Sequence, residues 1–513
     1  MGKGGQLLQQ NSSLDEDPTI GRAIRKDIPI SVLETKNSLD ECWLAYDGLV
    51  YDVTHWIPKH PGGIRAIMSA AGQDATSVMN SLHHPSTLET MMKRTRCVGR
   101  LVVSESDAEK KKKQQAKLIN DDFEQLGQEL IRDGWYEPKL SAYIFPVLRV
   151  IALFAFGLCL VYRGDGLATW LDTLQVILGS ISIGLFFQNI AFLGHDAGHG
   201  SITGRFDYDL YLGLLVGNGL TGIDLGWWKS THYVHHSATN SLHDDPDIQH
   251  MPLLCFEERF SDDGRWSSYH GRYLPGLQHV LARVLVPYQH WYFYPVLCVA
   301  RFSLHIMSIG HVLQTCPWFY SQSEQIVTED NKVKEKYAWP KPSTSLWLLQ
   351  AGTLIFYWTM LYTYLTSLET LFTSALSLFC IYVTTGILHV QIVLSHISME
   401  YCEDGHGVTG ASSVGSYYEW QALSTMDVDC PPWMDWFHGG LQFQLEHHLF
   451  PRIPRRNLRK LMAKTDAIFA KHGIPVTRKT FFEANAQLLR HMKCVGEAVA
   501  RRVVVEQQHV KQQ

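Results

Sequence analysis

The stretch His195-Asp196-Ala197-Gly198-His199 directly follows a long apolar run, residues 174–193, and this junction decides the fold class. The apolar run is long enough to cross a bilayer, which takes about 20 residues. The two histidines stand four positions apart, so they lie on one face of a helix that continues out of the membrane. The sequence therefore predicts a pair of imidazoles held at the end of a membrane-spanning helix.

Two further clusters repeat this arrangement of histidines. His-Tyr-Val-His-His occupies residues 232–236 and Gln-Leu-Glu-His-His occupies residues 444–448, both with helical i, i+3 and i+4 spacing. His396, at the end of the last apolar run, is placed to approach the same site. Three clusters exceed the three or four protein ligands of one zinc ion, and imidazole suits iron. The predicted ligands of two first-row metal ions are His195, His199, His232, His235, His236, His396, Gln444, His447 and His448.

Acidic residues beside these clusters have two interpretations. Asp196, Glu446 and the acidic run 244–247 can orient the ligand imidazoles through hydrogen bonds. They can equally be solvated surface charge, and the sequence leaves both interpretations open.

Four apolar runs are long enough to span a bilayer, and the first is interrupted by Arg149. They are residues 140–162, 174–193, 346–365 and 371–395. Residues 292–313 are marginal because Arg301, His305 and His311 interrupt them, and residues 210–222 suit an interfacial piece.

Four crossings place every histidine cluster on one side of the membrane. The basic clusters 110–113 and 452–459 lie on that same side, which the positive-inside rule makes cytosolic. The small net charge of −5 argues against nucleic acid as the main partner, and the absence of a CxxC pair argues against thiolate zinc sites. The 25 histidines instead indicate metal ligation.

The chain divides into five segments. Residues 1–27 are polar and predicted to be disordered. Residues 28–104 form a compact α+β stretch with a hairpin turn at Asp47-Gly48. A linker helix over 105–139 leads to an all-α membrane domain, 140–480, and a tail, 481–513.

The three histidine clusters resemble the histidine boxes of membrane fatty-acyl and sphingolipid desaturases. In its leading residue, Gln444, the third cluster resembles the third box of the front-end subgroup. The resemblance covers about residues 35–480. It implies a polytopic membrane domain with about four transmembrane helices, a cytosolic histidine-box cap and two non-haem iron ions that use O₂. It also implies the endoplasmic reticulum membrane as the location.

His60-Pro61-Gly62-Gly63 resembles the haem-binding signature of cytochrome b5, a small α+β domain. His84 follows at the spacing of the second axial ligand, and His83 is its rival. Two axial imidazoles leave no position for O₂, so such a haem b passes electrons. Tethering by residues 105–138 raises the local concentration of this donor, and NADH-cytochrome b5 reductase is the implied electron source.

Residues 425–433, 438–443, 389–396 and 226–229 look most like sphingolipid long-chain-base Δ8 desaturases of plants and fungi. The alternative is a front-end Δ6 or Δ5 fatty acyl desaturase. Trp227, Trp228, Trp433 and Trp436 either line the lipid tunnel or anchor the membrane interface. Outside this class, a membrane haem electron carrier leaves the box histidines unused, and a metal transporter needs ionisable residues within its spans.

Overall fold

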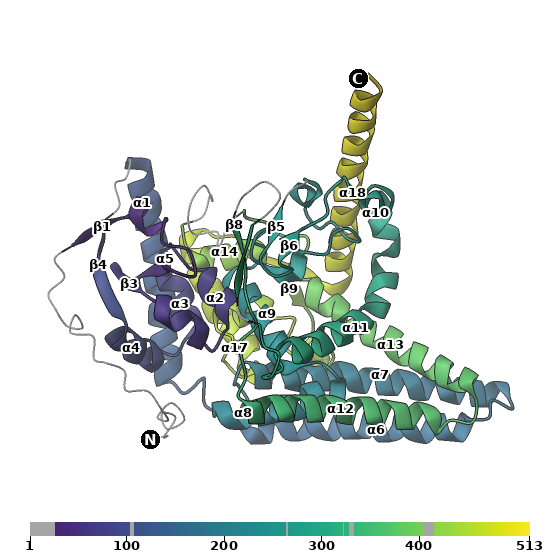
Figure 1. The fold of residues 1–513 in the computed structure, drawn as a ribbon. Helices are drawn as coiled ribbons and strands as arrows, with labels where there is room; N and C mark the ends of the chain where they lie inside the picture. Colours follow the sequence, from purple (N-terminus) through teal and green to yellow (C-terminus); the bar gives the residue numbers. More distant parts are fainter. Residues whose placement is uncertain are drawn as a thin grey trace.

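The computed structural model describes residues 26–102, 107–262, 265–321, 323–327, 333–403 and 415–512. A small domain with a sheet lies beside a larger, mostly helical domain (Figure 1). The predicted disordered segment 1–27 falls outside the described residues except for its last two, and Asp27 already begins a strand.

A four-stranded sheet with the order β1-β4-β3-β2 organises the N-terminal domain. Asp47 and Gly48 adopt φ values of 50° and 72°, so the predicted hairpin turn between β2 and β3 is confirmed. The strands are β1 (Asp27–Pro29), β2 (Trp43–Tyr46), β3 (Leu49–Asp52) and β4 (Arg96–Val102). The helices are α1 (Ile30–Leu33), η1 (Thr54–Lys59), α2 (Ile64–Met68), α3 (Thr76–Leu82) and α4 (Pro85–Arg94).

The predicted linker helix forms as α5, Asp107–Arg132, and it packs on the larger domain from Ala116 onward. Its buried face includes Ile119, Phe123 and Leu130, and Phe123 stacks on Tyr418 with ring centroids 4.6 Å apart. The partners of α5 are α14 (Tyr417–Ser424) and α17 (Leu458–His472). The segment is therefore a packed strut on the larger domain.

Four long helices run between the same two ends of the larger domain (Figure 1). The Tyr162 hydroxyl lies 2.7 Å from the Ser367 hydroxyl, and the Glu369 N–H donates to Asp165, so the turns between the two helix pairs lie together. These helices are α6 (Ile144–Gly164), α7 (Trp170–Gly198), α12 (Thr344–Thr366) and α13 (Leu371–Val393).

Composition selects a slightly different set of spans. Among the described residues, four helices are long and apolar enough to cross a membrane: Leu140–Gly164, Trp170–Gly198, Val280–Gln314 and Leu371–Val393. Three of these helices match predicted runs. The fourth, Val280–Gln314, contains the marginal segment 292–313 and takes the place of the predicted run 346–365. Its interrupting residues turn inward: Arg301 donates to the Thr221 carbonyl at 2.6 Å, and His311 lies 2.7 Å from Asp224.

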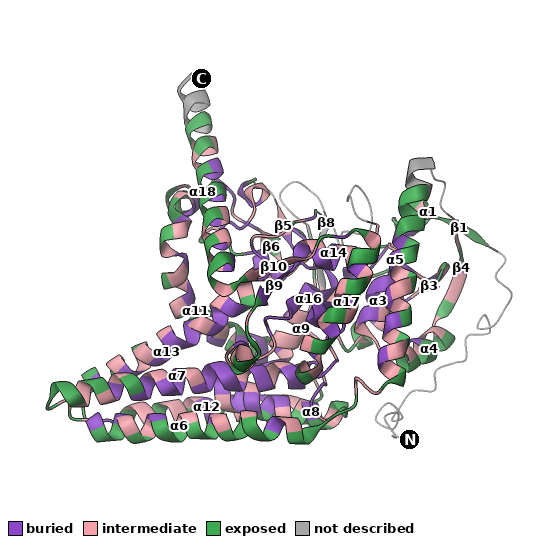
Figure 2. Cartoon of the chain, turned by 180° about the vertical axis from the view of Figure 1, so that it is seen from behind, coloured by how far each residue is buried: buried purple, intermediate pink, exposed green. Residues whose placement is uncertain are grey.

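In the larger domain α12 packs mainly against η3 (Leu214–Thr221), and α13 packs mainly against α7. Trp347, in the first turn of α12, donates to the Val312 carbonyl at 2.8 Å, so α11 (Gln289–Gln314) ends where α12 begins. At its other end, Gln289 bonds the backbone of Cys255. On their outer sides, α6 and α12 expose apolar side chains such as Phe145 and Ile355, as a bilayer requires (Figure 2).

The segment expected to be a tail is α18, Phe481–Gln512, and its buried residues, among them Leu488 and Met492, join the core of the larger domain. Strands β9 and β10 pair in parallel beside it. The remaining helices are η2 (Leu140–Tyr143), α8 (Phe206–Gly213), η3 (Leu214–Thr221), α9 (Leu225–Ser237), η4 (Pro246–Ile248), η5 (Glu258–Ser261), α10 (Val280–Leu285), η6 (Val286–Tyr288), η7 (Pro432–Met434), α15 (Asp435–His438), α16 (Gln444–Leu449) and η8 (Arg455–Asn457). The remaining strands are β5 (Trp266–Ser267), β6 (Arg272–Tyr273), β7 (Glu324–Val327), β8 (Val333–Lys336), β9 (Met426–Asp429) and β10 (Thr477–Thr480).

Candidate metal centre and haem site

The predicted histidine ligands converge on one site from four parts of the chain. They come from the end of α7, from α9, from the segment after α13 and from α16. Within the described residues, their donor atoms form two groups in which all atoms lie within 4.8 Å of one another. The first group is His195, His199, His232 and His447, and the second is His235, His396 and His448.

His236 and Gln444 lie beside these groups. The Nε2 atom of His236 is 3.1 Å from that of His232, which in turn is 3.0 Å from that of His199. The His236 ring also stacks on His448 with centroids 4.2 Å apart, so it lies between the two groups. Gln444 is buried, and its Oε1 has no hydrogen-bond partner among the described residues. Its role as a ligand stays a prediction.

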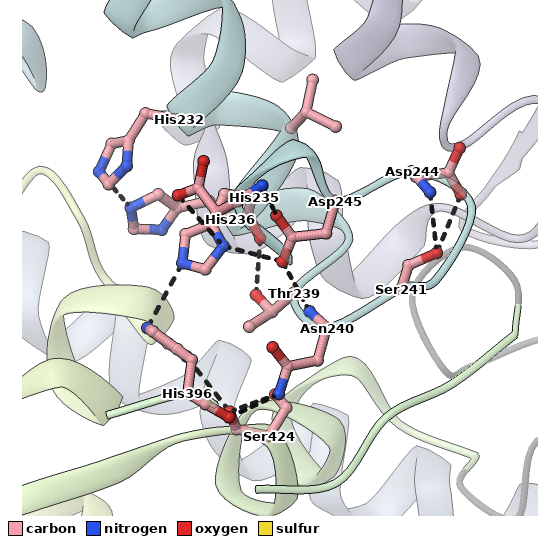
Figure 3. Close-up of polar contacts among 12 residues, drawn as sticks. His232, His235, His236, Thr239, Asn240, Ser241, Asp244, Asp245, His396 and Ser424 are labelled. Atoms are coloured by element: carbon pink, nitrogen blue, oxygen red, sulfur yellow. Dashed lines mark hydrogen bonds and ion pairs between the residues drawn. The ribbon is translucent and has the colours of Figure 1, made fainter. Parts of the chain in front are cut away.

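Hydrogen bonds at Nδ1 aim the second group at a common point. His235 donates from Nδ1 to Asp245 at 3.0 Å, and His396 donates from Nδ1 to the Ser424 carbonyl at 3.2 Å (Figure 3). With Nδ1 occupied in this way, each ring presents a lone pair at Nε2 in its neutral form. Those two Nε2 atoms face each other at 3.3 Å, and facing lone pairs need a cation between them.

His448 completes the second group in the same way. Its Nδ1 lies 2.9 Å from the Gln421 amide oxygen, which leaves Nε2 free to bind. Among the described residues, Nε2 of His195, His447 and His448 is buried without a hydrogen-bond partner. Buried polar atoms are normally satisfied, so these three nitrogens fit a missing metal ion.

The electrostatics of the site favour neutral imidazoles. Burial lowers the pKa of the ring far below its usual value, and neighbouring imidazoles lower the pKa further. The residues affected are His199, His232, His236, His396, His447 and His448. His235 is the exception: burial lowers its pKa, but Asp245 outweighs burial and raises it to about 9. Neutral imidazole is the form that binds a metal ion.

The predicted supporting acids divide into those that reach an imidazole and those that do not. Asp245 bonds His235, whereas Asp244 turns to the Ser241 hydroxyl at 3.2 Å (Figure 3). Asp196 lies 3.7 Å from His195 Nδ1 and is held by Arg455 at 2.6 Å. Glu446 instead accepts a hydrogen bond from Thr465 at 2.8 Å.

The partners of His396 and His448 carried no sequence signal. Ser424 acts through its backbone carbonyl, and Gln421 is an ordinary helix residue of α14. Only the fold brings this helix to the site.

The four singled-out tryptophans occupy different places. The Trp228 ring stacks on His232 with centroids 4.3 Å apart, and Trp227 is buried beside it on α9. Trp433 and Trp436 are exposed. Trp228 therefore borders the metal groups, and the latter pair suits an interface.

In the haem domain, His60 faces His83 instead of His84. The ring centroids of His60 and His83 are 6.0 Å apart. Both rings use Nδ1 on a backbone carbonyl, that of Gly63 at 3.2 Å and that of Met79 at 3.1 Å, so each keeps a lone pair at Nε2. This pair fits two axial positions of one haem iron.

The His84 ring is used differently. The Ser86 N–H donates to its Nδ1 at 3.3 Å, so the neutral ring carries its proton at Nε2 and has no lone pair there. This contact makes His84 the N-cap of α4. The geometry favours His83 as the second axial ligand over the predicted His84.

Two family models match the chain. The model described as "Fatty acid desaturase" matches residues 171–480, and the one described as "Cytochrome b5-like Heme/Steroid binding domain" matches residues 30–102. Both matches coincide with the domains that carry the metal groups and the facing histidines.

Similar proteins cover nearly the whole chain. The "Delta(8)-fatty-acid desaturase" of Helianthus annuus is 33% identical, with 91% of both chains covered. The "Acyl-lipid (9-3)-desaturase" of Borago officinalis is 30% identical, with 92% of this chain and 93% of its own covered. The "Delta 8-(E)-sphingolipid desaturase" of Komagataella phaffii is 29% identical, with 88% of this chain and 90% of its own covered.

Proposed function

The chain belongs to the fatty acid desaturase family and carries a fused cytochrome b5-like domain, and from this premise we propose that it introduces a Δ8 double bond into sphingolipid long-chain bases. It is a lipid desaturase, an oxidoreductase. The desaturase chemistry in this proposal rests on the pair of adjacent histidine groups, with Nε2 atoms facing one another inside a buried site, and the Δ8 position and substrate rest on the named relatives.

We assign the two groups to a pair of iron ions. His195, His199, His232, His236 and His447 would hold one ion. The other ion would be held by His235, His396 and His448, together with Gln444, which lies on the same helix as His448. When bound, such a pair supplies the O₂-dependent removal of two hydrogens from adjacent methylenes, a step beyond side-chain acid–base chemistry.

Residues around the two histidine groups orient the rings and exclude water from the site. Asp245, Gln421 and the Ser424 carbonyl fix the ring orientation of the second group. Trp228 covers His232 on the side of the first group. The lipid would lie where two neighbouring C–H bonds face both groups, because positioning of this kind supplies much of the barrier reduction.

The fused domain supports electron delivery through haem b. We assign His60 and His83 as its axial ligands, since both rings present a free Nε2. An NADH-dependent cytochrome b5 reductase would supply the electrons. The four apolar helices suit a membrane protein, and we place it in the endoplasmic reticulum with the histidines facing the cytosol.

Two substrate classes remain in competition. The relatives named as Δ8 desaturases of sphingolipids favour a long-chain base, and they share most of this chain. The Borago acyl-lipid relative supports the alternative, a fatty acyl chain. Both substrates need the same site chemistry, so only the product distinguishes them.

Expression of the full chain in a host that lacks Δ8-unsaturated sphingoid bases tests the proposal. New Δ8 bases in the lipid extract, lost in His447→Ala, are the expected result. New Δ6 or Δ5 acyl products instead would assign the acyl alternative. An intact haem spectrum with no lipid product and no non-haem iron would indicate an electron carrier.

A further inference from the structure

The haem domain lies directly on the elements that carry the metal groups. The hydroxyl of Ser69, the residue that follows α2, is 3.0 Å from that of Ser237, the residue after His236. On α3, the Ser81 hydroxyl donates to the Leu449 carbonyl at 2.8 Å. Both serines are buried. The interface is therefore a packed, hydrogen-bonded contact.

Ser81 occupies the point of closest chemical connection. It precedes His83, which faces His60, by two residues. Its hydroxyl lies 3.4 Å from the carbonyl of His448, a member of the second metal group, besides the bond to Leu449. The side chain of Ser81 thus connects the chain two residues before His83 to the backbone of His448.

Tyr417 extends this junction to the first metal group. Its ring is fully buried, and its helix α14 packs against α3, which carries Ser81. The Tyr417 hydroxyl donates to the His236 carbonyl at 2.9 Å. Ser81 therefore contacts the backbone of His448, and Tyr417, on the neighbouring helix, contacts the backbone of His236.

We propose that Ser81 and Tyr417 form the electron-transfer contact between the haem domain and the metal centre. This inference rests on the haem and metal assignments proposed above. Each transfer oxidises one haem iron from ferrous to ferric and reduces one metal ion from ferric to ferrous, so no radical or proton is left on Tyr417. Ser81 and Tyr417 are positioning residues that couple the two centres.

Two other hydrogen-bonded contacts of the interface start further along the chain from a haem-facing histidine than Ser81 does. Ser69 is nine residues from His60 along the chain, although it is also buried and hydrogen-bonded across the interface. Arg65 reaches the Tyr337 carbonyl at 2.8 Å and packs on Trp339, both remote in sequence from the histidine clusters. Ser69 is therefore a matched control of the same residue type.

The test is flash photoreduction of the haem in the oxidised, anaerobic full-length holoenzyme, with haem reoxidation followed by absorbance. Neither O₂ nor lipid is needed, so the measured rate reports transfer to the metal ions alone. The variants are Ser81→Ala, Ser81→Thr, Tyr417→Phe and Ser69→Ala. The haem midpoint potential and the iron content are measured on every variant.

Reoxidation should slow severalfold in Ser81→Ala and Tyr417→Phe, with potential and iron content unchanged. Ser81→Thr keeps the hydroxyl and should restore the rate, and Ser69→Ala should match the wild type. Wild-type rates in both Ser81→Ala and Tyr417→Phe, or equal slowing in Ser69→Ala, would overturn the inference. A wild-type haem that stays reduced would instead overturn the proposed function.

Discussion

Single hydrogen bonds at Nδ1 decide what each histidine can do. His83 and His84 are adjacent and have the same side chain, but their Nδ1 atoms have different partners. His83 donates to the Met79 carbonyl, whereas His84 accepts from the Ser86 N–H. The first arrangement leaves a lone pair at Nε2 and the second places a proton there. Spacing along the chain favours His84, but spacing does not report these hydrogen-bond partners.

The haem assignment can be tested by comparing His83→Ala with His84→Ala. Purified His83→Ala should lose the bis-histidine absorbance spectrum and most of its haem. His84→Ala loses only a helix cap, which costs about 1 kcal/mol, and should keep the spectrum. Loss of haem in His84→Ala with retention in His83→Ala would reverse the assignment.

Asp245→Asn should weaken metal binding at the second group. Asp245 accepts the Nδ1 proton of His235, and loss of such a partner typically lowers metal affinity by about 10- to 100-fold. Iron per protein, measured by elemental analysis after dialysis, should fall. Asp244→Asn is the matched control, because that carboxylate bonds Ser241 and should leave the iron content unchanged.

At the scale of elements, α5 holds the haem domain in place. Its buried residues pack on α14 and α17, and Lys471 pairs with Asp122 at its surface. The sequence of residues 105–139 indicated a helix but not its docking face. Helix α14 also supplies Gln421 and Tyr417. Helix α5 therefore supports α14, which lies between the haem domain and the metal-facing histidines.

Phe123→Ala should therefore destabilise the whole chain. Its ring is fully buried between Tyr418 and Phe469, and truncation of a buried Phe costs about 3–5 kcal/mol. Thermal unfolding of the solubilised protein should shift down by several degrees. Leu118→Ala, on the exposed side of α5, should change stability by less than about 0.5 kcal/mol. Equal shifts for both variants would contradict the packed strut.

At the scale of the whole molecule, the buried histidines couple stability to pH. Six of them have a pKa held well below the usual value by burial and by neighbouring imidazoles. Below about pH 6.5 these histidines bind protons in the unfolded chain but stay neutral in the folded chain. The free energy of unfolding therefore decreases as pH falls. Each such group contributes up to about 1.4 kcal/mol per pH unit.

The unfolding temperature should accordingly be lower at pH 5.5 than at pH 6.5. His235, whose pKa is raised to about 9, stays protonated in the folded state across this window while the unfolded side chain is only partly protonated, so this one residue opposes the trend and the six neutral histidines outweigh it. Calorimetry or tryptophan fluorescence can follow the transition. An unfolding temperature that does not change between these pH values would show that the imidazoles are not buried as neutral groups.

The sequence alone determined the chemistry and much of the architecture of this protein. The i, i+3 and i+4 spacing of the box histidines, the turn at Asp47-Gly48 and three of the long apolar helices follow from local periodicity, which a single chain reports directly.

Only the tertiary structure decided which histidine faces His60, which residues orient the metal-facing rings and how α11 and α12 are placed. Their partners lie far apart in sequence, as Gln421 and His448 or Trp347 and Val312 do. Such contacts depend on how whole elements pack, and packing leaves no local pattern in the chain.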